Sequence, residues 1–295
     1  MQNVYEQVSA NKTRSDIVII LFIGFIILAA YAITVAFELD PSVLAIAAIF
    51  SIVSAVGSFY FGDKIILSLN GARLADRKEF FDYYTVVENL SLANQSPMPQ
   101  IYVIDSPAPN AFATGRDPEH AVVCATTGLL QKLNRTELEG VIGHELSHVK
   151  NYDIRLMMIV SMLIGSLSIL TNMVQRNRFF GSRRRDNDSS INGLLAILGV
   201  FLLIFAPLIG KLIQLAISRR REFLADASSV KLTRQPQGLI DALKKISSDP
   251  NALSSASTAT ASLYISNPFK DNKLASLFST HPPILDRIKA LESML

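Results

Sequence analysis

The 295-residue chain has one cysteine, Cys124, and no tryptophan. A single thiol excludes an internal disulfide framework, a CxxC redox motif and an all-cysteine zinc site. Charged residues are also scarce, at 18% of the sequence against about a quarter in an ordinary soluble domain. Because hydrophobic residues reach 49% and the mean hydropathy is +0.32, the composition excludes a disordered chain and indicates a membrane protein with a soluble portion. The net charge of +3 is too small to indicate a nucleic-acid partner.

Two long uncharged segments near the N-terminus are each able to span a bilayer, which takes about 20 residues. The first runs from Ile17 to Phe37 and the second from Ser42 to Phe61. Because only the short stretch Glu38 to Pro41 separates them, we expect a tight helical hairpin. A cleaved signal peptide is the alternative for the first segment, but its apolar run continues beyond the length typical of such peptides.

Basic residues flank this hairpin, whereas its connecting turn holds two acids and no base. The flanking bases are Lys12, Arg14, Lys64, Arg73, Arg77 and Lys78. The positive-inside rule therefore predicts that the N-terminus and the chain from residue 62 onward face the cytoplasm.

A second pair of apolar stretches, Leu156 to Val174 and Ile191 to Gly210, lies later in the chain. The linker between them is rich in arginine, so a full crossing would place bases outside, against the positive-inside rule. The pair either crosses in breach of that rule or lies partly in the interface. Giving more weight to span length, we expect four membrane-associated helices.

The remaining residues, 62–155 and 211–295, are together large enough for one compact domain. Helical periodicity, proline positions and a capping pair at Asn134 and Glu137 predict helices joined to a small sheet. The expected helices cover 75–95, 134–152 and 283–294, and the expected strands cover 101–104, 111–114 and 121–126.

The most informative motif is His144-Glu145-Leu146-Ser147-His148. On a helix, the two histidines lie one turn apart on the same side, so both nitrogens are able to bind one Zn²⁺. Glu145 lies next to the first histidine and is able to take a proton from a zinc-activated water. The alternative is a helix with two buried, hydrogen-bonded histidines. The capped, apolar setting of the motif favours the metal.

A catalytic zinc usually has three protein ligands and a water. Asn151 to Arg155 supply no third histidine at the metzincin spacing, and the other histidines are His120 and His281. A carboxylate is the other choice. Glu222 begins a helical stretch, and Asp226 follows one turn later, where it could orient a ligand imidazole. From residue types alone, Glu222 is equally well explained as a surface acid paired with neighbouring arginines.

Four runs of this sequence together resemble the HtpX family of membrane-bound zinc metalloproteases, heat-shock quality-control enzymes related to the CAAX prenyl proteases. They are Glu139 to Asp153, Ser218 to Val230, Asn110-Ala-Phe-Ala-Thr-Gly115 and Thr280-His-Pro-Pro283. The HExxH motif alone is shared by many metalloproteases, but its combination with Glu-x-x-x-Asp after a hydrophobic hairpin is far more specific. The resemblance covers nearly the whole chain.

The resemblance implies a role for particular residues. One zinc ion is implied to bind His144, His148 and Glu222, with Glu145 as the general base. Asp226 is implied to orient a zinc ligand.

His281 and Arg287 match a histidine and an arginine near the C-terminus of the family, implied to assist the transition state or to position active-site groups. A donor near the scissile carbonyl would stabilise the oxyanion. The alternative is a structural His-Pro-Pro turn. The four residues Asn110, Ala111, Phe112 and Ala113 resemble a substrate-facing edge strand, to which an extended peptide could add. The alternative is an ordinary strand of the sheet.

We therefore expect a mainly α fold with a small β-sheet (α+β), as a gluzincin-type metalloprotease domain attached to transmembrane helices. Residues 1–61 form the N-terminal hairpin, and 62–155 form the first part of the protease domain with the HExxH helix. Residues 156–210 form the second hydrophobic hairpin, and 211–295 form the second part of the domain with the third ligand. The implied protein is a multi-pass enzyme of the cell membrane. The resemblance implies that it cuts misfolded or membrane proteins at the cytoplasmic face in quality control under stress.

Two other functions are open to the sequence. A membrane-anchored scaffold with a structural zinc would usually close its site with four protein ligands, whereas three and a general base are expected here. A transporter would place charged groups inside its spans, but the apolar stretches carry none before Lys211. The sequence indicates neither particular substrates nor an oligomeric state.

Overall fold

The computed structural model describes residues 4–36, 40, 42–162, 219–253, 260, 263–266, 268 and 282–295. Most of the expected second hairpin, its arginine-rich linker and His281 lie outside these residues. The described part is mainly helical with one small mixed sheet, so the predicted α+β class is confirmed at this level.

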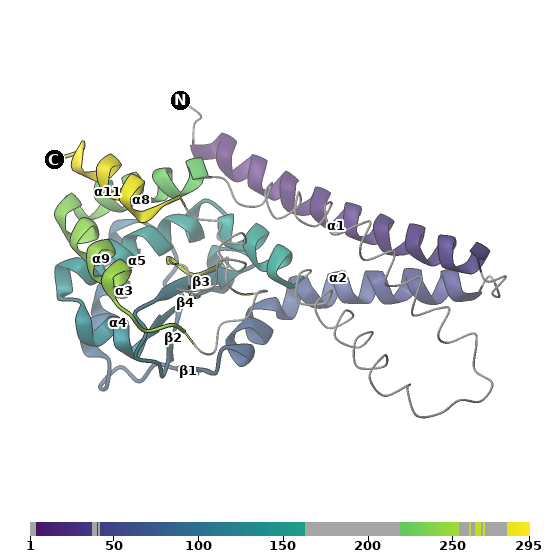
Figure 1. The fold of residues 1–295 in the computed structure, drawn as a ribbon, viewed down its shortest axis with the longest axis horizontal. Coiled ribbons are helices and arrows are strands. Elements are labelled where there is room, and N and C mark those ends of the chain that lie inside the picture. Colours follow the sequence, from purple (N-terminus) through teal and green to yellow (C-terminus); the bar gives the residue numbers. More distant parts are fainter. Residues whose placement is uncertain are drawn as a thin grey trace.

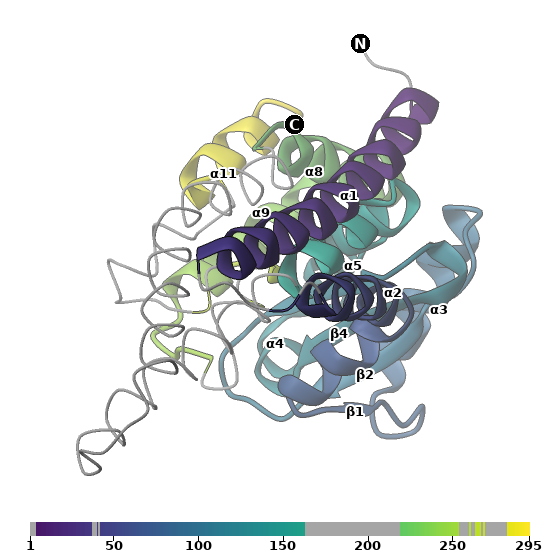
Figure 2. The same ribbon diagram turned by 90° about the vertical axis from the view of Figure 1, so that its right-hand side faces the viewer.

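Two long N-terminal helices, α1 (Val4–Ala36) and α2 (Ser42–Leu69), run side by side and project from the rest of the molecule (Figures 1 and 2). Many of their apolar side chains are exposed, including Ile20 on α1 and Ile49 and Val53 on α2. Within the described residues, one helix is long and apolar enough to cross a membrane. That stretch is Ile52–Leu69 of α2, with a mean hydropathy of 1.4. The multi-pass topology stays a prediction.

The sheet has the strand order β1-β2-β4-β3. Its strands are β1 (Ala72–Leu74), β2 (Gln100–Ile104), β3 (Ala111–Gly115) and β4 (Ala121–Thr126). β2 and β4 are parallel, and the two outer pairs are antiparallel. The sequence predicted β2, β3 and β4 but missed β1, because three residues are too few to show an alternating pattern.

Apolar side chains cover both faces of this sheet, which explains why every residue of β3 and β4 is buried. Val123 and Ala125 of β4 face the larger core, which includes residues of α5 and α9. Val122 and Cys124 face a smaller core built with the end of α2. Cys124 is fully buried, and burial raises the pKa of its thiol.

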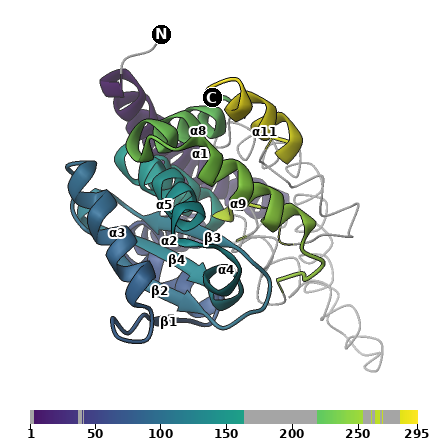
Figure 3. The same ribbon diagram turned by 90° about the vertical axis from the view of Figure 1, so that its left-hand side faces the viewer.

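The remaining helices are α3 (Phe81–Ala93), α4 (Thr127–Lys132), α5 (Arg135–Lys150), α8 (Arg219–Thr233), α9 (Pro236–Ser248) and α11 (Ile284–Glu292). Figure 3 shows α5 lying between the sheet and the pair α8 and α9. The expected helix start at residue 75 is wrong. The carboxylate of Asp76 accepts the amides of Lys78 and Glu79 and so stabilises a turn before α3. The start of α5 follows the prediction, with Asn134 and Glu137 forming a reciprocal capping box.

Candidate metal centre

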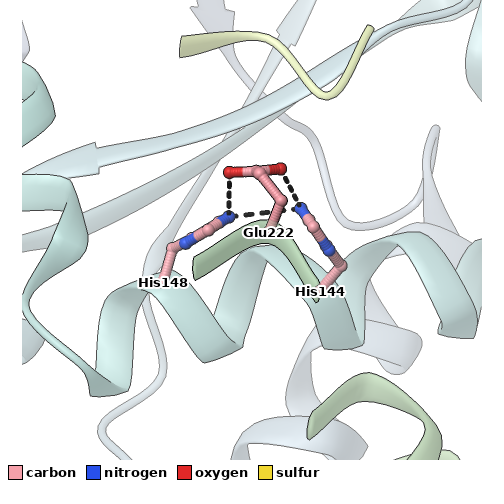
Figure 4. A group of neighbouring side chains, drawn as sticks. All are labelled: His144, His148 and Glu222. Carbon is pink, nitrogen blue, oxygen red and sulfur yellow. Dashed lines mark hydrogen bonds and ion pairs between the residues drawn. The ribbon is translucent and has the colours of Figure 1, made fainter. Parts of the chain in front are cut away.

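Two histidines of α5 and one glutamate of α8 converge inside the protein (Figure 4). Nε2 of His144 and Nε2 of His148 lie 3.2 Å apart. Each of these nitrogens is 3.6 Å from a different carboxylate oxygen of Glu222. All three side chains are buried, at 5% exposure or less.

The spacing of these atoms fits a divalent metal. Two donors that each lie 2.0–2.1 Å from one zinc at a tetrahedral angle are about 3.3 Å apart. The separations of 3.2 and 3.6 Å bracket this value. Two imidazoles and one carboxylate are also the donor set that a catalytic zinc uses with a water in the fourth position. The residues therefore fit the metal that the sequence implied.

A close approach of two helices brings Glu222 to the histidines. A methyl group added at Gly143 of α5 would come within 2.7 Å of the Ser229 hydroxyl oxygen on α8. The same hydroxyl donates to the main-chain oxygen of Gly140 over 2.6 Å. Glycine in α5 thus allows α8 to lie close enough for its glutamate to reach between the two imidazoles.

The second nitrogen of His144 faces a buried ion pair. Its Nδ1 is 2.8 Å from the Asp226 carboxylate, and Arg287 donates to both oxygens of that carboxylate over 2.9 and 2.6 Å. Arg287 also donates to the main-chain oxygen of Ile265 and is completely buried. This bidentate pairing places Arg287 against Asp226, and the role of Arg287 in the active site stays a prediction.

The ionisable groups around His144 shift one another. Burial lowers the pKa of His144, and so does the charge of Arg287, but hydrogen bonds with Asp226 and Glu222 outweigh both and raise it to about 9. Burial raises the pKa of Asp226, but the charge and hydrogen bonds of Arg287 dominate and lower it. Asp226 is therefore a carboxylate able to hold the Nδ1 proton and leave Nε2 for a metal.

Sequence reasoning missed the partner of the second histidine. Nδ1 of His148 is 3.1 Å from the carboxylate of Asp153, which is itself 3% exposed. This acid follows the end of α5 and was assigned no role from the sequence beyond its place at the end of the run Glu139 to Asp153. Its spacing, five residues after His148, was the available signal.

Glu145 directly follows His144 on α5 and is 2% exposed. Burial raises the pKa of its carboxyl group, and the charges of the two histidines and Arg287 offset only part of this effect. A carboxyl group with a raised pKa, next to a metal site, is suited to accept and return a proton.

The expected substrate strand, Asn110 to Ala113, begins just before β3 at the edge of the sheet and is buried. Part of its outer edge is already paired. The Ala111 oxygen accepts the Ile265 amide over 2.9 Å, and the Asn110 side chain donates to the Ser266 oxygen over 3.0 Å. The main-chain oxygen of Asn110 accepts the Thr126 amide of β4. Because the hydrogen-bonding groups alternate along a strand, the main-chain N–H and C=O of Ala113 point away from β4, as those of Ala111 do. No hydrogen bond from another described residue is seen on that outer edge at Ala113.

Two buried histidines and Glu145 on α5, with a buried glutamate reaching them from α8, are the arrangement typical of a metal-dependent hydrolase. Residues 79–295 match the profile of Peptidase family M48, so the chain belongs to this family. Two curated relatives described as Protease HtpX homolog come from Dictyoglomus turgidum and Streptococcus gordonii. They are 42% and 41% identical, cover 98% and 99% of this chain, and are themselves covered over 94% and 100%.

A solved structure, the crystal structure of S. mikatae Ste24p, has a related fold. Its TM-score is 0.51 at 21% identity, over 97% of this chain and 66% of that chain. The expected membership of the HtpX family is confirmed by the relatives, and the protein is a metalloprotease.

Proposed function

We propose that this metalloprotease is an integral-membrane zinc endopeptidase of gluzincin type that hydrolyses misfolded or membrane proteins at the cytoplasmic face. The observation that carries this proposal is the convergence of His144, His148 and Glu222, with donor spacings that suit one zinc. Family membership supports the peptidase chemistry. The substrates and the role in quality control under stress rest on the resemblance of the sequence.

In this proposal each side chain has a separate task. His144, His148 and Glu222 would hold the metal, which when bound supplies Lewis acidity for the scissile carbonyl and for water. The Glu145 carboxylate takes the proton of the attacking water and returns it to the leaving nitrogen. Arg287 acts through Asp226, because it donates hydrogen bonds to both carboxylate oxygens of that acid.

The substrate would enter as an extended peptide along β3. Since Ala111 is already paired with Ile265, the peptide would begin its main-chain pairing at Ala113. This register extends the expected substrate strand toward Gly115. His281, which the resemblance links to the transition state, remains part of the proposal from sequence alone.

The proposed membrane arrangement places the metal centre on the cytoplasmic side. The exposed apolar faces of α1 and α2 support burial of these helices in lipid. The bases at both open ends of the hairpin support the cytoplasmic side by the positive-inside rule.

The decisive test compares the detergent-purified protein with its Glu145→Gln and Glu222→Ala forms, by metal analysis and casein cleavage. Glu145→Gln should keep zinc and lose hydrolysis, since an amide is unable to accept the proton. Glu222→Ala should lose both. Zinc binding without cleavage in the unaltered protein would instead support a membrane-anchored scaffold with a structural metal.

A further inference from the structure

The N-terminal helix reaches the metal centre through one buried polar side chain. Asn11 lies on α1 before its apolar part begins at Ile17, and it is 3% exposed. Its amide nitrogen donates to the Asp153 carboxylate over 2.7 Å. Because the other oxygen of that carboxylate is 3.1 Å from Nδ1 of His148, two consecutive hydrogen bonds join α1 to a metal-binding imidazole.

The Asp153 carboxylate divides its two oxygens between distinct partners. Oδ2 faces His148, while Oδ1 accepts from Asn11 and from Arg221 of α8 over 3.1 Å. A buried carboxylate needs such partners to offset its loss of hydration. These bonds also fix its rotation, so that one oxygen is directed at the histidine ring.

Asn11 holds the backbone of the adjoining turn as well. The same amide nitrogen donates to the main-chain oxygen of Asn151 over 2.9 Å. The next residue, Tyr152, has a φ of 60°, a left-handed conformation that is uncommon for tyrosine and ends α5 sharply. Asn11 therefore ties together the turn and the carboxylate that the turn carries.

Neighbouring residues of α1 contact the same turn. The Lys12 ammonium lies 4.2 Å from the centre of the Tyr152 ring, and Asp16 pairs with Arg155 over 2.8 Å. Partly exposed contacts of this kind contribute little energy individually. Their common direction shows that this segment of α1 is seated on the end of the metal-binding helix.

We propose that Asn11 is a positioning residue of the metal centre, which holds Asp153 so that His148 presents Nε2 to the metal. Seating of α1 is then a condition for a complete site, and the helix that leads into the membrane controls metal affinity. This inference rests on the proposed metal binding by His144, His148 and Glu222.

The test measures zinc affinity of the full chain in detergent by competition with a chelator. Asn11→Ala should weaken binding on the order of 10-fold, the lower end of the range for residues that orient metal ligands. Asn11→Asp preserves size but has no N–H and adds a carboxylate beside Asp153, so its loss should be at least as large. Thr13→Ala, at an exposed position of the same helix, should leave the affinity unchanged.

A double-variant cycle separates positioning from general packing. In an Asp153→Ala background, Asn11→Ala should weaken zinc binding no further, because the residue through which it acts is gone. The visible spectrum of the Co²⁺-loaded protein should change in Asn11→Ala at saturating metal but not in Thr13→Ala. Equal losses in both backgrounds, or unchanged affinity in Asn11→Ala and Asn11→Asp, would overturn the proposal.

The same titrations separate this inference from the proposed metal site. If the unaltered protein binds no zinc, or Glu222→Ala binds it equally tightly, the metal site itself is wrong and the role of Asn11 fails with it. If the unaltered protein binds zinc tightly and Glu222→Ala does not, the metal site is correct. Unchanged zinc affinity in the Asn11 variants would then overturn only the role of Asn11.

Discussion

Replacing Arg287 with methionine would remove the guanidinium that pairs with the buried Asp226 carboxylate and leave Nδ1 of His144 as its remaining partner among the described residues. The carboxylate is 1% exposed and would lose two hydrogen bonds, of 2.9 and 2.6 Å. Removing one partner of a buried ion pair costs about 3–5 kcal/mol in the free energy of unfolding. Since 1 kcal/mol shifts the melting temperature of a domain of this size by about 2–4 °C, the midpoint should fall by roughly 6–20 °C.

The assay is thermal unfolding of the detergent-solubilised protein with a chelator present, so that changes in metal affinity do not enter. The matched control is Lys244→Met. It removes an exposed ion pair between Lys244 of α9 and Glu292 of α11, the helix that also carries Arg287. Such a pair contributes about 0–1 kcal/mol. Adding Asp226→Asn to Arg287→Met should recover part of the loss, because it removes the buried carboxylate charge that the guanidinium no longer balances.

The reasoning would be refuted by a midpoint of Arg287→Met that falls no further than that of Lys244→Met. A double variant that is less stable than Arg287→Met alone would also contradict it. In either case, the ion pair would not be the contact that fixes α11 against the metal centre.

Three further predictions concern the ligands, pH and topology. Glu222→Ala should abolish zinc binding and casein cleavage, whereas Asp226→Asn should weaken zinc binding on the order of 10–100-fold; equal metal content in Glu222→Ala and the unaltered protein would exclude it as a ligand. Zinc affinity should rise with pH up to about 9, by about tenfold per unit, because the metal displaces a proton from His144, whose raised pKa favours the protonated form below that value; a chelator titration at several pH values would show a flat profile if no proton leaves. A cysteine at Glu38 should react with an impermeant thiol reagent on intact cells and one at Asp63 should not; the reverse pattern would invert the topology.

Local sequence signals predicted much of the secondary structure. The capping pair Asn134 and Glu137 identified the start of α5, because both hydrogen bonds form within one turn. Three of the four strands were found from their apolar runs between prolines and glycines. The strand order was not predictable in this way. Parallel pairing of β2 with β4 depends on packing against helices from distant parts of the chain.

In the candidate site too, contacts within one helix were predictable from the sequence, whereas contacts between distant parts of the chain were not. The histidine spacing on one helix was sufficient to predict their convergence, and the resemblance supplied Glu222. Asp226 was expected to orient one imidazole, but its contact with Arg287 was not predicted, and neither were Asp153 and Asn11 on the side of His148. Asn11 and Asp153 are 142 positions apart in the sequence, and Arg287 reaches Asp226 across 61. No periodicity or motif connects residues at such separations.

The order in which the metal donors appear along the chain has a consequence for biosynthesis. The two histidines of α5 are synthesised well before Glu222 of α8, and Arg287 follows later still. A nascent chain that has not yet reached α8 holds two of the three donors and lacks the ion pair beside His144. Since chains begin to fold from the N-terminus during synthesis, the candidate metal centre is complete only after the later helices have docked.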